Sequence, residues 1–166
     1  MITQIYEARS SNEAKSLVEA GVDYVGVLVS TKDKYPGILN LEQAIIVLNE
    51  VTGGAKKVIL PFTKDLNEIS LIAKKIKPDI LHIAVEPGDI SPTDIQALKK
   101  QFPDIKIMRT IPVVDEDSVN LAKQYDGVAD YLLLDSRSKK NNQIGVTGET
   151  HDWKLSKKSL TQFLSL

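Results

Sequence analysis

Residues able to exchange protons lie at or near the ends of short apolar runs in this sequence. Asp135 closes the run LLLD, His82 lies within ILHIAV, and Tyr6 lies within QIYEA near the start of the chain. Carboxyl and imidazole groups have reference pKa values of about 4 and about 6.5, so both can take part in acid–base chemistry near neutral pH. An aspartate at a strand end is also common for turn reasons alone. Both interpretations of Asp135 are kept.

Several kinds of chemistry have no residues to support them. The 166 residues contain no cysteine, which excludes disulfides, thiolate metal sites and a thiol nucleophile. Neither a phosphate-binding P-loop nor a dinucleotide-binding glycine pattern occurs. We therefore expect a protein without a metal or a cofactor.

The composition is that of an ordinary globular protein. It is 42% hydrophobic and 26% charged with a formal net charge of -1, which gives no electrostatic reason to expect nucleic acid or an anionic membrane as partner. The length favours one domain over residues 1–166. Because no signal peptide and no membrane-spanning apolar window is found, we expect a cytoplasmic protein.

Strand and helix patterns alternate along the chain. The apolar, β-branched runs predict strands, and apolar residues at three- and four-residue spacing predict the helices between them. Strands that are apolar on nearly every residue indicate a parallel sheet covered on both faces. This alternation of strands and helices is compatible with an open doubly wound sheet or a TIM-type barrel. The long loops at 30–40 and 136–151 are candidate lids over a site. The predicted strands are 3–8, 24–29, 57–62, 80–84, 106–110 and 131–135, and the predicted helices are 12–20, 41–51, 66–75, 92–102 and 115–125.

Four segments carry a resemblance to a known family. They read LLLDS at 132–136, GVTGETHDW at 145–153, VEAGVDYVGVLV at 18–29 and ILHIAV at 80–85. In this order they resemble the phosphoribosylanthranilate isomerase family, a TIM barrel of tryptophan biosynthesis. The resemblance implies a TIM-type (β/α) barrel that is incomplete here, with about six parallel βα units. The family continues into two more strands, whose glycine-rich loops bind the substrate phosphate.

The resemblance also implies a reaction and a set of site residues. The family catalyses an Amadori rearrangement of a small phosphorylated sugar-amine: a general acid opens the ribosylamine ring, and a general base removes the C2′ proton. Asp135 matches the general acid, whereas Tyr6 stands at the position of the family's basic cysteine and Glu7 at that of the following glycine. A phenol is mostly protonated at neutral pH, which makes it a poor base unless its pKa is strongly lowered. Further candidates for contact with the substrate are Lys34, Gly145 and Gly148.

Side-chain alternation extends this expectation to further residues. If Asp135 faces the barrel interior, Tyr6, His82 and Arg109 should face it too. His82 is then a candidate acid–base group and Arg109 a candidate substrate-binding group. The alternative is a structural network with an ion pair between Asp135 and Arg109. Trp153 is expected to pack the following helix against the sheet.

Three hypotheses for the function remain open. The first is an isomerase of this family in which the general acid is kept and the general base is replaced. The second is a non-catalytic descendant that self-associates, because six parallel strands leave two open sheet edges that a closed barrel lacks. The third is an altered C-terminus, since residues 156–166 no longer resemble the family.

Overall fold

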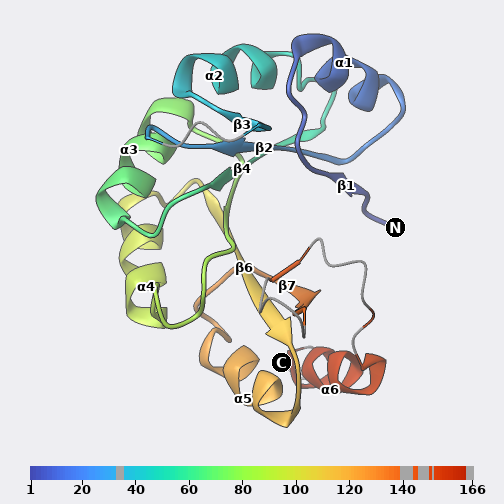
Figure 1. Ribbon diagram of the computed structural model, residues 1–166, viewed down its shortest axis with the longest axis vertical. Coiled ribbons are helices and arrows are strands. Elements are labelled where there is room, and N and C mark those ends of the chain that lie inside the picture. The colour runs from blue at the N-terminus through green and yellow to red at the C-terminus, as the bar shows by residue number, and fades with distance from the viewer. Residues whose placement is uncertain (33–35, 139–143, 146–149, 151, 164–166) are drawn as a thin grey trace.

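The computed structural model describes residues 1–32, 36–138, 144–145, 150 and 152–163, with side chains described as far as residue 159. Its strands form one curved sheet, and the helices lie around the outside of the curve (Figure 1). No helix within these residues has both the length and the apolar composition needed to cross a bilayer. The strands are β1 (Gln4–Ile5), β2 (Tyr24–Val29), β3 (Ile38–Leu39), β4 (Lys56–Pro61), β5 (Ile80–Ile83), β6 (Lys106–Val113) and β7 (Tyr131–Ser136). The helices are α1 (Ser11–Glu19), α2 (Leu41–Asn49), α3 (Leu66–Ile76), α4 (Pro92–Gln101), α5 (Glu116–Gln124) and α6 (Trp153–Phe163).

The sheet is parallel throughout and follows the order β1-β2-β4-β5-β6-β7, with the short β3 also paired to β2. Among the described residues, β1 pairs only with β2, and β7 pairs with no other strand than β6. The sheet therefore curls into an arc that stays open between β1 and β7 (Figure 1). The predicted fold, an incomplete TIM-type barrel of six parallel units, is confirmed.

Local chemistry fixes where the helices begin. The side chains of Asn40, Asp65, Ser91 and Asp115 each accept hydrogen bonds from backbone amides in the first turn of the following helix. Pro92 takes the first position of α4, where its missing N–H costs nothing. All five predicted helices are present, with ends that agree within two residues.

Apolar side chains pack on both faces of the sheet. The larger cluster lies between the strands and the surrounding helices and includes Val27, Ile59 and Ile107, none of which is exposed. The smaller cluster lies on the opposite, concave face, where the side chains of Tyr6, Tyr24 and Leu133 pack around a buried centre. Because side chains alternate along each strand, the concave face can be assigned residue by residue. That buried centre consists of Val58, Ile80 and Met108.

Four details differ from the prediction. β6 continues to Val113, whereas the predicted strand ends at residue 110. β1 ends at Ile5 rather than at residue 8, because Glu7 has a left-handed backbone with φ of 63° that cannot continue a strand. The loop at 30–40 contains the unpredicted strand β3, too short to produce a periodic signal. The prediction for Trp153 is wrong: its side chain is 72% exposed at the first position of α6, where it faces solvent.

Candidate active site

A cleft of about 540 Å³ occupies the concave face of the sheet. Its lining includes Tyr6 and Glu7 after β1, His82 on β5, Asp135 on β7 and Gly145 in the loop beyond β7. In a parallel sheet the carboxyl ends of all strands meet at one edge, so these residues from distant parts of the chain come together. The cleft is therefore the place where this chain could handle a small substrate.

Asp135 is held at the end of β7 by its neighbours. It pairs in register with Pro112 of β6, and its Oδ1 accepts a hydrogen bond of 2.8 Å from the backbone amide of Ser136. Gly145 packs directly against the carboxylate, and its own amide donates to the Ser136 carbonyl at 2.8 Å. A Cβ at position 145 would overlap Asp135 Oδ2, and φ at this glycine is 70°. Gly145 thus confines the carboxylate on one side.

Tyr6, His82 and Thr110 form a connected network beside Asp135. The Tyr6 hydroxyl is hydrogen-bonded to His82 Nδ1, and His82 Nε2 shares a hydrogen bond of 2.6 Å with Thr110 Oγ1. The Tyr6 ring packs against Gly26 of β2, so closely that any Cβ at position 26 would overlap it. Both imidazole nitrogens are therefore engaged, which fixes the orientation of a buried histidine.

The environment sets the protonation of this network. Burial, together with the positive charge of Arg109, lowers the pKa of His82 to about 3, so the imidazole is neutral at physiological pH. Burial raises the pKa of the Tyr6 hydroxyl, and the nearby Asp135 carboxylate raises it further despite an opposing hydrogen bond with Gln4. Tyr6 is therefore protonated, and the pair formed by Tyr6 and His82 in the cleft is neutral.

The prediction that Arg109 faces the barrel interior is wrong. Thr110, its neighbour on β6, occupies the concave face, which places Arg109 on the helix-facing side. There the guanidinium is fully buried, donates from Nη1 to the carbonyls of Ile83 and Val85 at 2.8 Å, and stacks on the Tyr125 ring. A substrate in the cleft does not meet this side chain. The expected ion pair with Asp135 is likewise absent among the described contacts.

Two of the expected substrate contacts, Lys34 and Gly148, lie outside the described residues. Of the remaining site predictions, Asp135, Tyr6, His82 and Gly145 share the lining of one cleft. Across the described residues, no group of three His, Asp or Glu side chains is arranged to hold a metal ion. The residues that line the cleft include two with carboxyl groups, three tyrosines and one histidine, which are side chains capable of proton transfer.

Glu7 is the cleft residue to which the sequence analysis assigned no role. Its carboxylate is 40% exposed, and Oε2 receives a hydrogen bond of 2.7 Å from Nη2 of Arg9. The signal was present in the sequence, because a glutamate stood at the position where the resemblance implies a glycine. Its direction could not be foreseen, since strand alternation would have turned Glu7 away from Tyr6.

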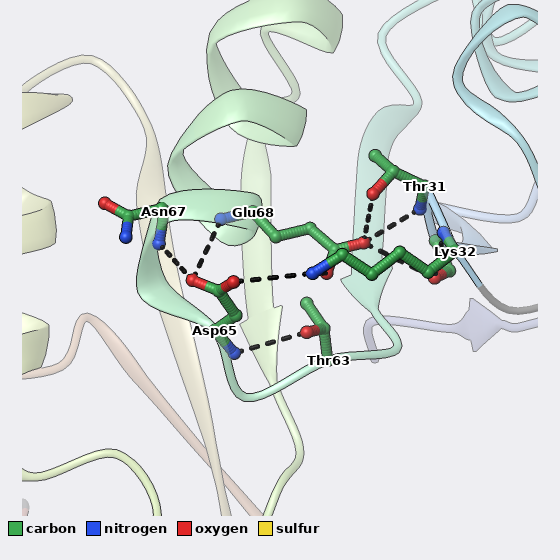
Figure 2. Close-up of polar contacts among 7 residues, drawn as sticks. Thr31, Lys32, Thr63, Asp65, Asn67 and Glu68 are labelled. Atoms are coloured by element: carbon green, nitrogen blue, oxygen red, sulfur yellow. Dashed lines mark hydrogen bonds and ion pairs between the residues drawn. The ribbon is translucent and has the colours of Figure 1, made fainter.

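A second carboxylate network lies at the same edge of the sheet (Figure 2). Glu68 in the first turn of α3 accepts hydrogen bonds from the Thr31 amide at 2.9 Å and from the Thr31 hydroxyl at 2.5 Å. Lys32 lies 3.3 Å from the other carboxylate oxygen and also contacts Asp65. Burial raises the pKa of Glu68, but the bonds from Thr31, Thr63 and Lys32 outweigh burial and hold that pKa at about 2. This network ties the loop after β2 to the start of α3.

Comparison with known proteins gives a consistent result. No family model matches the chain. The N-(5'-phosphoribosyl)anthranilate isomerase of Methanocella arvoryzae is 28% identical over 145 residues, which are 87% of this chain and 65% of that protein. The second such isomerase of Methanosarcina mazei is 26% identical over 138 residues, 83% of this chain and 60% of that protein. The chain thus spans less than two thirds of the length of these relatives.

Solved structures share the fold. Phosphoribosyl anthranilate isomerase from Thermus thermophilus superposes with a TM-score of 0.74 at 16% identity, over 97% of this chain and 72% of that one. A phosphoribosyl anthranilate isomerase in complex with reduced 1-(o-carboxyphenylamino)-1-deoxyribulose 5-phosphate gives a TM-score of 0.63 at 20% identity, over 82% and 66% of the two chains. At these identities the structures establish the fold alone.

Proposed function

Because the chain is a divergent relative of the N-(5'-phosphoribosyl)anthranilate isomerases, we propose that its cleft isomerises a small phosphorylated sugar-amine, with N-(5'-phosphoribosyl)anthranilate as the first candidate substrate. Asp135 acts as the general acid that protonates the ring oxygen of the sugar. The observation that carries the proposal is the position of Asp135, which lines the cleft at the carboxyl end of β7. Strand ends of this kind are where catalytic residues of barrel enzymes lie.

The surroundings of Asp135 suit this role. Its carboxylate is fixed by the Ser136 amide and confined by Gly145, so it keeps one orientation toward the cleft. Proton transfer by a positioned side chain typically accelerates a reaction by about 100-fold to 10,000-fold. A fixed carboxyl group that lines a cleft of this volume supports the proposed transfer.

Tyr6 and His82 are assigned a supporting role in this proposal. A general base must be unprotonated and able to accept a proton near neutral pH. The raised pKa of Tyr6 keeps it protonated, and a His82 pKa of about 3 makes that imidazole a weak base. The hydrogen bond between Tyr6 and His82 fixes two side chains that line the cleft. The general base of the reaction must therefore be another residue.

Turnover of N-(5'-phosphoribosyl)anthranilate tests the proposal directly. The substrate is generated in the assay, and its disappearance is followed by fluorescence with the 166-residue chain and with buffer alone. Substrate loss above the uncatalysed rate, together with growth of a tryptophan auxotroph that lacks the isomerase, is the expected result. A folded chain that gives neither result would leave the isomerase proposal without support.

The open sheet favours a second candidate function, a self-associating binding protein. Each terminal strand of the described sheet is paired on one side only, and such edges can pair with another chain. Sedimentation over a range of concentrations distinguishes the two states. A dimer that binds N-(5'-phosphoribosyl)anthranilate without converting it would favour this candidate, and a strict monomer would count against it.

A further inference from the structure

Glu7 has a left-handed backbone conformation that its position in the fold does not explain. Among the described non-glycine residues, only Glu7 and Lys77 have positive φ, at 63° and 51°. Lys77 is the C-cap of α3, a place where the left-handed conformation is common because it satisfies the last carbonyls of a helix. Glu7 lies beyond a two-residue strand and ends no helix. A strained backbone at a non-glycine residue is most often found at functional sites.

The strained backbone changes where the Glu7 side chain lies. In a regular strand, consecutive side chains point to opposite faces, so Tyr6 and Glu7 could not both line the concave face. Here both line the same cleft, which also contains Asp135. The left-handed φ at Glu7 is the local departure that breaks the alternation. Glu7 thus adds a second acidic residue to the lining of the cleft, from the opposite end of the sheet from Asp135.

The carboxylate of Glu7 is also held in place. Nη2 of Arg9 donates a charge-assisted hydrogen bond to its Oε2 at 2.7 Å. Gly37, from the loop after β2, packs on this pair: a Cβ at position 37 would lie 3.2 Å from Glu7 Oε2 and 3.4 Å from Nε of Arg9. With a φ of 94°, Gly37 adopts a conformation that other residues avoid. Arg9 and the loop after β2 therefore both restrict the position of this carboxylate.

We propose that Glu7 is the general base of this cleft and a catalytic residue for the isomerisation, a proposal that rests on the function proposed above. After Asp135 has given its proton to the ring oxygen and the ring has opened, the substrate is a protonated imine. Glu7 takes the proton from C2′, the electrons of that C–H bond form a C1′–C2′ double bond, and the former C–N π electrons go to nitrogen. Return of a proton to C1′ and loss of the hydroxyl proton at C2′ give the ketone, so one hydrogen has moved from C2′ to C1′.

This assignment separates the two proton-transfer roles in space. Asp135 comes from β7 at one border of the open sheet, and Glu7 follows β1 at the other. The hydrogen-bonded pair of Tyr6 and His82 lines the same cleft and is neutral at physiological pH. A substrate held in the cleft can therefore meet an acid and a base from different sides.

A comparison of wild type with Glu7→Gln and Glu7→Gly tests this role. The control is Glu19→Gln, which makes the same chemical change on an exposed surface of α1. Turnover of N-(5'-phosphoribosyl)anthranilate, the isotope effect with substrate deuterated at C2′, and binding of reduced 1-(o-carboxyphenylamino)-1-deoxyribulose 5-phosphate are measured for each. We expect Glu7→Gln to lose at least about 100-fold in kcat, to bind the reduced compound within about threefold of wild type, and to show a larger isotope effect.

Glu7→Gly separates catalysis from structure. Glycine relieves the positive φ, so the unfolding midpoint should rise while turnover falls as in Glu7→Gln. A Glu7 that served only the structure would give the opposite, a lower midpoint with kcat unchanged in the folded fraction, and that result would overturn the proposal.

The wild-type chain provides the remaining distinction. Wild-type turnover that survives in Glu7→Gln would overturn the role of Glu7 and leave the proposed isomerase intact. Absence of any turnover in the folded wild-type chain would overturn the isomerase, and the role of Glu7 with it. Loss of turnover in Glu19→Gln would show that the change reports on general stability, which also counts against Glu7.

Discussion

Two glutamates at the carboxyl edge of the same sheet have very different surroundings. The side chain of Glu68 is 4% exposed, lies in a regular first turn of α3 and is contacted by Ser30, Thr31 and Lys32. That of Glu7 is 40% exposed, follows a left-handed backbone and is held by Arg9 (Figure 2 shows the network of Glu68). One carboxylate is surrounded by donors, and the other keeps access to a cleft of substrate size.

One edge of the sheet can therefore carry both a stabilising carboxylate and a reactive one. A buried carboxylate whose hydrogen bonds are satisfied fixes two segments together, but its low pKa makes it a poor proton acceptor at neutral pH. A carboxylate with solvent access and few contacts contributes little to folding and can bind or release a proton at a substrate. We therefore expect substitutions in the two regions to separate cleanly into effects on stability and effects on turnover.

The largest effect on turnover is expected at Asp135. Asp135→Asn keeps the shape and the bond from the Ser136 amide but removes the transferable proton, so kcat should fall at least about 100-fold while the unfolding midpoint changes little. Asp104→Asn, in an exposed turn, is the matched control. Steady-state turnover and thermal unfolding of both variants check this. Equal turnover in the Asp135 variant would remove it from the mechanism.

Glu68→Gln should show the reverse pattern. The free energy of unfolding should drop by roughly 2 kcal/mol at pH 7, less than the full pKa shift would give because Lys32 is exposed to solvent. Turnover per folded molecule should stay unchanged. Denaturant unfolding beside Glu42→Gln, an exposed glutamate in the first turn of α2, measures the difference.

The same carboxylate predicts an acid dependence. The pKa of Glu68 is lowered from 4.5 to about 2 on folding, so its contribution is complete above pH 4.5 and is lost as the pH falls toward 2. The difference in the free energy of unfolding between wild type and Glu68→Gln should therefore shrink as the pH falls from 4.5 toward 2. A difference that stays constant down to pH 2 would contradict the origin assigned to the pKa shift.

His82 provides a smaller effect at milder pH. Its pKa falls from 6.5 to about 3 on folding, so below pH 6.5 the unfolded chain binds a proton that the folded chain does not. Stability from the buried neutral ring is complete above pH 6.5 and declines as the pH falls, by about 1.4 kcal/mol per pH unit. At pH 5.5 the loss should be about 1 kcal/mol, and it should be missing in His82→Gln. Unfolding at pH 7.5 and 5.5 compares the two proteins.

The smallest expected effect is that of Tyr6→Phe. The ring still fills the space over Gly26, and the lost hydroxyl removes one hydrogen bond to His82, at a cost of about 1 kcal/mol in stability. Turnover should stay within about threefold of wild type, because the cleft keeps both carboxylates. A much larger loss in kcat would show that Tyr6 takes part in catalysis, and would weaken the contrast between the regions of Glu68 and Glu7.

Much of the fold followed from the sequence because it depends on local patterns. Helix starts at Asn40, Ser91 and Asp115 carry capping side chains, and buried strands such as Tyr24–Val29 are apolar throughout. The face of the sheet on which a strand residue lies is harder to predict. Arg109 was assigned to the interior by counting from a matched position, and an error of one residue reverses the face. Its true environment depends on carbonyls of β5 and on the Tyr125 ring, which are distant in sequence.

The site was only partly predictable for the same reason. Asp135, Tyr6 and His82 were recognised by type and position, and they do line one cleft. The direction of Glu7 depends on a single backbone angle, which alternation rules do not anticipate. The depressed pKa of His82 depends on burial and on the charge of Arg109, neither of which can be obtained from the sequence alone.

The contact between Tyr6 and Gly26 couples two positions that are far apart in the sequence. A Cβ at position 26 would overlap the Tyr6 ring. With the ring in this place, only glycine fits at position 26, so the two positions cannot be varied independently of each other.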